Sequence, residues 1–422
     1  MKSSGRVTTL LALTAVLLLG RALPVLAEEL LTWDECIAEA AAYNASLQAA
    51  DRRLRAAQMN VDSAHGGYFP EVNAEFNYDY GDRGSTGNTN SYSAGIKGKQ
   101  NLFGGFADEK RIEQARAAVL LAKSERQIVR AQVSFELKTG FQELLFAQSN
   151  KALTGQIIAR REENYRLVSL RYDSGRENKG SVLLFQAYLE QARYEDLQAG
   201  HDVEVARAQL RRVMGRDERA EFTASGVVPM SDPLSAPDFG ELARQTPEYQ
   251  QALYQEQFDL RAISLARSPL YPSLDLNGQF VREGDDATPD DNNWSVGASL
   301  NVPLFSGLRD YYSVKSARAL AEASSVDALD AVRRARTRLE QTHAAFVESR
   351  QKVLVDELFM KAASIRAEIA RSKYNNGLLS FEDWDVIEND LISRQKNHLQ
   401  SLRNHVTTEA AWQQAQGKAV FE

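Results

Sequence analysis

Four segments of the chain alternate between apolar and polar residues, a pattern that predicts β-strands with one face of each kind. They lie at about 70–81, 91–103, 272–283 and 293–305. In the first segment the apolar positions are Val72, Ala74, Phe76, Tyr78 and Tyr80. Each run is about ten residues long, which is the length that a tilted strand needs to cross a bilayer. A strand of a soluble sandwich would show the same alternation, so the strands alone do not decide between the two.

Two long stretches without proline predict two unusually long helices. One runs from about 105 to 171 and the other from about 307 to 373. At 1.5 Å per residue, such a helix is a rod of roughly 100 Å. Small apolar residues recur along the first stretch at heptad-like spacing, at Ile112, Ala115, Val119, Ala122, Val129 and Val133. This spacing is typical of coiled-coil packing.

The same landmarks occur twice, 202 residues apart. Pro70 returns as Pro272, Phe103 as Phe305, Tyr172 as Tyr374 and Gly175 as Gly377. A constant offset over more than a hundred residues indicates a duplicated fold. The sequence therefore predicts a mostly α-helical chain with two structural repeats, each in the order helix, strand, strand, long helix, helix. The first repeat spans 28–219, the second spans 238–422, and a linker at 220–237 joins them.

The N-terminal residues 1–27 predict a signal peptide that is absent from the mature fold. A basic start with Lys2 and Arg6 precedes an apolar stretch, Thr8–Gly20, and Val25–Ala27 offers a cleavage site. The stretch is too short for a membrane-spanning helix. Its removal takes positive charge from a chain whose formal net charge is already −7. An acidic exported chain is a poor candidate for binding nucleic acid, which clustered Lys and Arg recognise.

Four candidate membrane strands per chain cannot close a barrel alone, because unpaired strand edges are not tolerated in lipid. Two copies would give eight strands with a lumen filled by side chains, and three would give twelve strands around an aqueous pore. The polar faces carry charged residues, which favour water inside the barrel: Glu71, Glu75, Asp79, Lys97, Lys99 and Asp275. The sequence therefore predicts a homotrimer.

Residue patterns for catalysis or cofactor binding are not found in this sequence. The five histidines are scattered, and no phosphate-binding glycine loop occurs. The acidic loop Asp285–Asp291 fits either a cation site or a solvated turn. The single cysteine, Cys36, fits a small apolar position on the first helix. We predict no enzyme activity, no metal and no cofactor.

The duplicated plan resembles the TolC-type outer membrane efflux proteins. The resemblance rests on Phe-Gly-Gly and Phe-Ser-Gly opening the long helices and on tyrosine-glycine turns closing them, at Phe103–Gly105, Phe305–Gly307, Tyr172–Gly175 and Tyr374–Gly377. It implies a trimeric 12-stranded β-barrel in the outer membrane and an α-helical tunnel through the periplasm. It also implies a passive conduit for efflux of small molecules or secretion of proteins, including type I secretion. The implied partners are outer membrane lipid, a periplasmic adaptor (membrane fusion) protein and an inner-membrane pump of the ABC or RND type.

In the family the two helix–turn–helix tips form the periplasmic entrance, which here implies the segments 172–181 and 374–383. The resemblance implies that the entrance is formed by Tyr374, Glu382, Asp383 and Asp385. It implies that the adaptor docks on the turn residues Ser174, Gly175, Arg176, Asn376, Gly377 and Leu378. Carboxylates gathered at a narrow symmetry axis would favour cations.

Three positions depart from the family pattern. The second family aspartate falls on Val386, and the residues that tie the tips shut fall on Leu379 and Ser181. These departures leave open whether the resting entrance is closed. The acids at 382–385 also fit a solvated helix N-terminus, where acidic residues are favourable. The alternative function is a periplasmic coiled-coil adaptor or scaffold protein without a membrane barrel.

Overall fold

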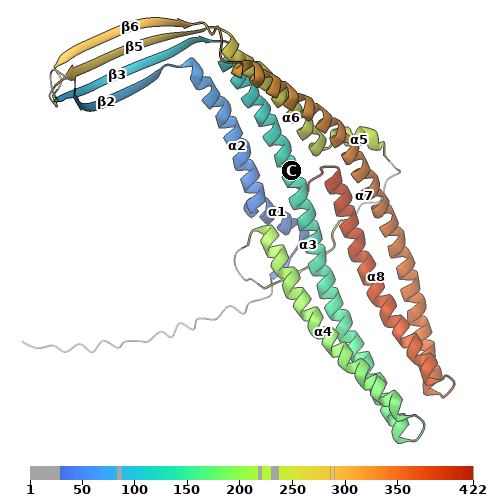
Figure 1. Ribbon diagram of the computed structural model, residues 1–422. Coiled ribbons are helices and arrows are strands. Elements are labelled where there is room, and N and C mark those ends of the chain that lie inside the picture. The colour runs from blue at the N-terminus through green and yellow to red at the C-terminus, as the bar shows by residue number, and fades with distance from the viewer. Residues whose placement is uncertain are drawn as a thin grey trace, which may run out of the picture.

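The computed structural model is elongated, with a curved β-sheet at one end and two helical hairpins at the other (Figure 1). It describes residues 29–82, 88–216, 221–229, 237–285, 287–288 and 290–421. The predicted signal peptide and parts of the predicted linker and strand-connecting loops lie outside these residues, as does Asp286 of the acidic loop. Asp285 and Asp291, the first and last residues of the acidic loop, are exposed.

The sheet consists of four antiparallel strands in the order β2-β3-β5-β6. The strands are β2 (Glu71–Asp82), β3 (Asn88–Gly104), β5 (Ser273–Gly284) and β6 (Asp291–Asn301). Each repeat supplies one hairpin, and the β3–β5 pairing joins the two repeats. Strands β2 and β6 form the two edges, so within the described residues one side of each has no strand to pair with.

Strand β6 ends at Asn301, which corrects the predicted end near residue 305. Asn301 pairs with Ser273, the first residue of β5, so residues 302–305 have no strand beside them among the residues that the structure describes. Pro303 also lacks a backbone N–H. By contrast, β3 continues to Gly104 because it still pairs with β5 there, past an irregularity between Asn101 and Phe103.

The two faces of the sheet differ in polarity, as the alternation predicts. Phe76 and Trp294 lie on the apolar face and are 81% and 75% exposed. On the polar face, Lys97 lies 2.6 Å from Glu75 across the β2–β3 pairing, and Lys99 lies 3.4 Å from Asp275 across β3–β5. Large apolar side chains left in contact with solvent on one face mark a surface that another medium or partner covers.

The long helices α3 (Ala107–Asp173) and α7 (Arg309–Asn375) each contain 67 residues. Both begin after two consecutive residues in the left-handed conformation. Gly105 and Phe106 have φ values of 63° and 67°, and Gly307 and Leu308 have values of 67° and 66°. Glycine adopts this conformation freely, whereas Phe106 and Leu308 adopt it at a cost. The same costly turn 202 residues apart supports the duplication.

The other helices flank the long ones. In the first repeat they are α1 (Trp33–Tyr43), α2 (Ala45–His65) and α4 (Lys179–Met214); in the second they are α5 (Phe239–Gln245), α6 (Pro247–Arg267) and α8 (Phe381–Ala415). Near the sheet the neighbours run α2, α3, α6, α7, and towards the tips they run α4, α3, α8, α7. Among the described residues, no helix has both the length and the apolar character that a membrane crossing requires.

The largest core lies midway along the helices. There β1 (Glu29–Leu31) pairs in parallel with β4 (Phe222–Ala224), a strand within the predicted linker that the sequence did not indicate. Around this pair, side chains of α1, α3 and α4 are fully buried, including Phe141, Leu144 and Leu210. Cys36 belongs to the same core, and burial raises the pKa of its thiol to about 12.

Candidate functional site at the hairpin tips

The two hairpins end in turns of the same geometry (Figure 1). Gly175 and Gly377 have φ values of 71° and 72°. The backbone N–H of Arg176 donates to Arg171 over 2.8 Å, and that of Leu378 donates to Lys373 over 2.8 Å. These are the bonds of a helix C-terminus that ends on a left-handed glycine. The sequence therefore determines both turns through their glycines.

The six predicted docking residues are all exposed at these turns: Ser174, Gly175, Arg176, Asn376, Gly377 and Leu378. Leu378 is the most apolar of them and is 75% exposed. The turns also differ between the repeats, since Arg176 stands where the second repeat has Leu378. The tips thus present one basic and one apolar turn to the surroundings.

Tyr374, by contrast, is buried at the centre of an aromatic group that joins the two hairpins. Its ring stacks on Trp384 with 4.2 Å between the ring centroids, and the guanidinium of Arg171 lies 4.4 Å from the Tyr374 centroid. Trp384 stacks in turn on Phe185 of α4. We call the buried residues of this group the tip cluster: Val168, Phe185, Ala370, Tyr374 and Trp384.

The hydroxyl of Tyr374 donates a hydrogen bond to Glu177 over 3.0 Å. Glu177 lies in the turn of the first hairpin and also accepts from the Ser181 hydroxyl over 3.0 Å. Burial, together with this bond to a carboxylate, raises the pKa of Tyr374 above its usual range. Sequence reasoning directed attention to Ser181 and missed Glu177, the residue that contacts Tyr374. The only signal for Glu177 in the sequence was that it is an acidic residue in the turn of the first hairpin.

The three acids predicted at the entrance lie in different environments. Asp383 belongs to the start of α8, where its backbone N–H donates to the Ser380 hydroxyl over 3.1 Å and its carboxylate accepts from the same hydroxyl over 2.9 Å. Glu382 is exposed, whereas Asp385 is partly buried against α4. Asn389 donates to Asp385 over 2.9 Å. Glu382 and Asp383 therefore face solvent as acids of a helix N-terminus do, and Asp385 does not.

Burial raises the pKa of Asp385 above its usual value, and the nearby Arg161 partly opposes this shift. Arg161 lies over the ring of Tyr188, with its guanidinium carbon 4.6 Å from the ring centroid. It donates to Asn389 over 2.6 Å. These contacts connect α3 with α4 and α8 just above the tip cluster. The three departures from the family pattern lie nearby: Ser181 is buried, Leu379 packs on the tip cluster and Val386 is 66% exposed.

A second set of contacts between the hairpins centres on Glu388, which is fully buried on α8. Arg160 of α3 binds both of its oxygens, over 2.5 and 2.8 Å. Asn164 donates to Glu388 over 3.2 Å and accepts from Arg371 of α7 over 2.7 Å. We call these residues the inter-hairpin network: Arg160, Asn164, Arg371 and Glu388. A two-point arginine–carboxylate pair fixes orientation as well as distance, so the network holds the hairpins in one alignment.

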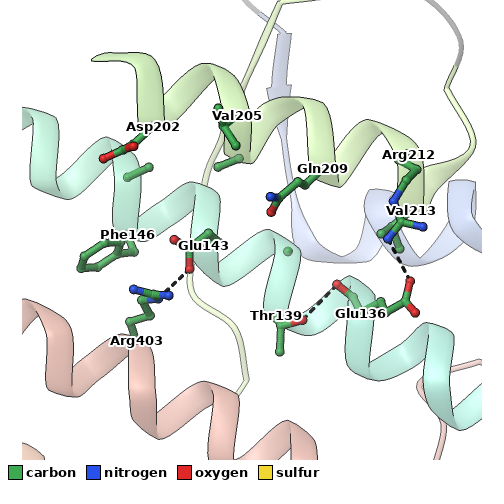
Figure 2. Close-up of a pocket in the computed structure, with 13 residues that line it drawn as sticks. Glu136, Thr139, Glu143, Phe146, Asp202, Val205, Gln209, Arg212, Val213 and Arg403 are labelled. Carbon is green, nitrogen blue, oxygen red and sulfur yellow. Dashed lines mark hydrogen bonds and ion pairs between the residues drawn. The ribbon is translucent and has the colours of Figure 1, made fainter. Parts of the chain in front are cut away.

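A groove of about 500 Å³ lies farther up the wall, between α3 and α4 (Figure 2). Arg403 of α8 reaches into it and lies 2.6 Å from Glu143, and Arg212 lies 3.2 Å from Glu136. Two carboxylates of the groove are therefore neutralised by arginines. Among the described residues, no group of three or more His, Cys, Asp or Glu side chains is arranged to hold a metal ion.

Comparison with known proteins matches this architecture to one family. The family model described as outer membrane efflux protein matches residues 36–216 and 240–418. The chain is similar to the outer membrane efflux protein BepC of Brucella suis biovar 1, with 21% identity over 97% of this chain and 90% of that protein.

Solved structures show the same fold. The outer-membrane channel OprN superposes with a TM-score of 0.79 at 20% identity, over 92% of this chain and 90% of that one. The open state of the Neisseria gonorrhoeae outer membrane channel MtrE gives 0.79 at 17% identity, over 92% and 89%. The Campylobacter jejuni outer membrane channel CmeC gives 0.79 at 14% identity, over 91% and 85%.

Replacing Glu388 with glutamine should destabilise the hairpins. Arg160, which is partly buried, would lose its anionic partner, and the cost should stay below the value of about 3 kcal/mol for breaking a fully buried pair. Chemical denaturation followed by circular dichroism should show this loss. Glu382→Gln is the matched control, because Glu382 is exposed on the same helix and should change stability by less than about 0.5 kcal/mol. Equal midpoints for the two variants would contradict a stabilising role for the network.

Asp385→Asn should change how stability depends on pH. Because the folded-state pKa of Asp385 is raised, the folded state holds the proton more tightly than the unfolded state. This contribution to stability is present below the unfolded pKa and is lost as pH rises through the folded pKa. At neutral pH the variant should therefore be at least as stable as the wild type, and its advantage should shrink as pH falls towards 4. Denaturation midpoints of the variant and the wild type, measured from pH 4 to pH 7, test this direction. A variant whose stability relative to the wild type is lower at pH 7 than at pH 4 would contradict it.

Proposed function

Since this chain belongs to the outer membrane efflux protein family, we propose that three copies form one closed tube, a passive conduit across the outer membrane with a long periplasmic extension. The family is one of transport conduits. Strands and helices of this chain both support the closed tube. The observation that carries the proposal is the pair of free edges on a sheet whose apolar face is exposed.

The free edges of β2 and β6 require partners in a membrane. A backbone N–H or C=O without a partner is costly in lipid, so the sheet must close. Four strands are too few, since membrane barrels begin at eight strands. Two copies would leave a lumen that side chains fill, whereas three give room for water. The charged pairs Lys97–Glu75 and Lys99–Asp275 on the polar face need hydration, which favours three copies.

The helical wall has free edges on the same two sides as the sheet. Helix α7 lies at one edge and α4 at the other. Each presents large apolar side chains that this chain leaves exposed: Leu358, Ile365 and Ile369 on α7, and Leu183, Tyr194 and Leu197 on α4. Their spacing follows the three-and-four residue rhythm of coiled-coil seams. Two different faces that complement each other generate a ring, because each copy uses one face towards each neighbour.

The hairpin tips form the periplasmic entrance in this proposal. The bond from Tyr374 to Glu177 and the inter-hairpin network hold the second hairpin against the first, which supports a closed resting state. Symmetry would bring three copies of Asp383 and Glu382 near the axis. Such a ring would favour cations, as rings of carboxylates do in other channels.

The partners belong to the same proposal. A periplasmic adaptor (membrane fusion) protein docks at the exposed turns that contain Arg176 and Leu378. An inner-membrane pump of the ABC or RND type supplies the energy and selects the cargo. The tube itself carries only general polarity, so the same conduit serves efflux of small molecules or secretion of proteins. A periplasmic scaffold without a barrel would not need four strands that each have one apolar and one polar face. Family membership also disfavours this alternative.

Tyr374→Phe should make the channel conduct more in planar bilayers. The change removes one hydrogen bond to Glu177, worth about 1 kcal/mol, or roughly a fivefold shift towards the open state. Tyr172→Phe is the matched control, because Tyr172 is the counterpart in the first repeat and is exposed. Conductance that rises equally in both variants would argue against a lock at Tyr374. A purified trimer that conducts in neither variant would overturn the conduit itself.

A photo-crosslinking residue at Arg176 or Leu378 should capture the periplasmic adaptor in intact cells. Both side chains are exposed at the turns, where the adaptor is proposed to dock. The same residue at Arg334, exposed on α7 far from the tips, is the control and should not capture it. Mass spectrometry identifies the captured protein. Capture of the adaptor from Arg334 alone would place docking elsewhere on the wall.

A further inference from the structure

A buried histidine connects α8 with α7, far from the hairpin tips. His405 lies roughly 36 Å along the helix axis from Phe381, where α8 begins, and is 6% exposed. Its ring stacks on Phe346 of α7, with 5.4 Å between the ring centroids, and its Nδ1 lies 2.9 Å from the Ser349 hydroxyl. That hydroxyl lies 2.7 Å from the hydroxyl of Thr408. We call these residues the histidine contact: Phe346, Ser349, His405 and Thr408.

The first repeat builds the equivalent contact from apolar side chains alone. Moved by 202 residues, the histidine contact becomes Leu144, Ala147, Val203 and Ala206. Three of these residues belong to the largest core, and Val203 packs against it. The fold therefore does not require a histidine or a hydroxyl group at these positions. Their presence in the second repeat indicates a role other than packing.

A surface groove leads from solvent to the histidine contact. It has a volume of about 770 Å³, lies between α7 and α8, and is lined by Ser349 and Thr408 among other polar residues. Its counterpart in the first repeat is the groove between α3 and α4 (Figure 2), where Ala147 and Ala206 replace the two hydroxyl groups. In the second repeat, a proton from solvent can thus reach the Nδ1 of His405 through the Ser349 hydroxyl.

The charged groups that face the His405 ring come from three helices. Glu409 belongs to α8 itself, Arg350 to α7 and Lys138 to α3. Lys138 lies 3.1 Å from Glu409, and both side chains are almost completely buried. Burial lowers the pKa of His405 below its usual value; Glu409 opposes this shift, whereas Arg350 and Lys138 add to it. The closed contact therefore favours the uncharged ring.

We propose that the histidine contact is a proton-sensitive connection between α7 and α8, which is closed while His405 is uncharged and opens when the ring takes up a proton. The added charge would lie in a place that the contact shields from water, which is costly. Both ring nitrogens would then carry a proton, so neither could accept a hydrogen bond. The contact lies within one chain, so it does not depend on the number of copies that assemble.

The direction of the pH effect follows from which form of the contact binds the proton more tightly. In the open form the ring is in water and has the usual histidine pKa, so the open form binds the proton more tightly than the closed form. The contribution of His405 to the closed form is therefore present above the usual pKa of about 6.5 and is lost as pH falls through that value towards the lower pKa of the closed form. This direction is opposite to the one expected for Asp385.

Hydrogen exchange followed by mass spectrometry tests the contact in the purified protein in detergent. Peptides that cover 343–352 and 400–410 report on the histidine contact. Peptides that cover 141–150 and 198–208 report on its apolar counterpart in the same molecule. After correction for the intrinsic exchange rate, protection of the histidine contact should fall by at least about threefold from about pH 7.5 to about pH 5.5. Protection of the counterpart should stay the same.

Three variants identify the group that takes up the proton, and the quantity compared is the change in protection between the two pH values. His405→Gln keeps a polar side chain without a titratable group and should remove the change. His405→Val, which introduces the residue type of the first repeat, should do the same. His201→Gln alters an exposed histidine of α4 and should behave as the wild type. The proposal is overturned if wild-type protection does not fall, if it falls equally in both repeats, or if the fall persists in both His405 variants.

Discussion

In lipid, an unpaired backbone N–H or C=O costs several kcal/mol, and in the part of the chain that the structure describes, the sheet has two edge strands, β2 and β6, with no further strand beside them. Much of the architecture depends on this constraint. Because the two edge strands come from different repeats, the two edges of the sheet differ from each other, and in the proposed ring the copies would join head to tail. The helices follow the same arrangement, since α3 and α7 have equal lengths and begin with the same left-handed turn. A wall built from equal units can close without a gap.

The repeats are equal where the wall is built and unequal at the tips. Tyr172 is exposed, whereas Tyr374, its counterpart, is buried between Trp384 and Arg171. The inter-hairpin network is likewise specific to the contact within one chain. Glu388 corresponds to Gln186 in the first repeat and Arg160 corresponds to Ala362 in the second, so the pair cannot recur between copies. Within one chain, the aromatic tip cluster and the charged inter-hairpin network join the two hairpins. In the proposed ring, neighbouring copies would meet through apolar seams instead.

Much of this fold could be predicted from the sequence because its signals are local. The strand at 70–81 and the two long helices could be predicted from patterns among residues that are close together in the sequence. The constant offset of 202 residues then showed that the two halves are related. The β1–β4 pair could not be predicted, since three residues are too few to show a period. Nor could the contact of Glu177 with Tyr374, or that of Arg160 with Glu388, because each joins residues about 200 positions apart. Such contacts depend on how the hairpins align, which no local pattern records.

Three copies that close into one ring form a particle with a fixed number of chains. Native mass spectrometry of the protein released from detergent micelles measures the number of chains in a particle directly. A closed ring should give a single species of three chains, with no free ends that would add a fourth. A monomer, or a series of particles of increasing size, would contradict it, because either result would mean that the free edges do not meet in a closed ring.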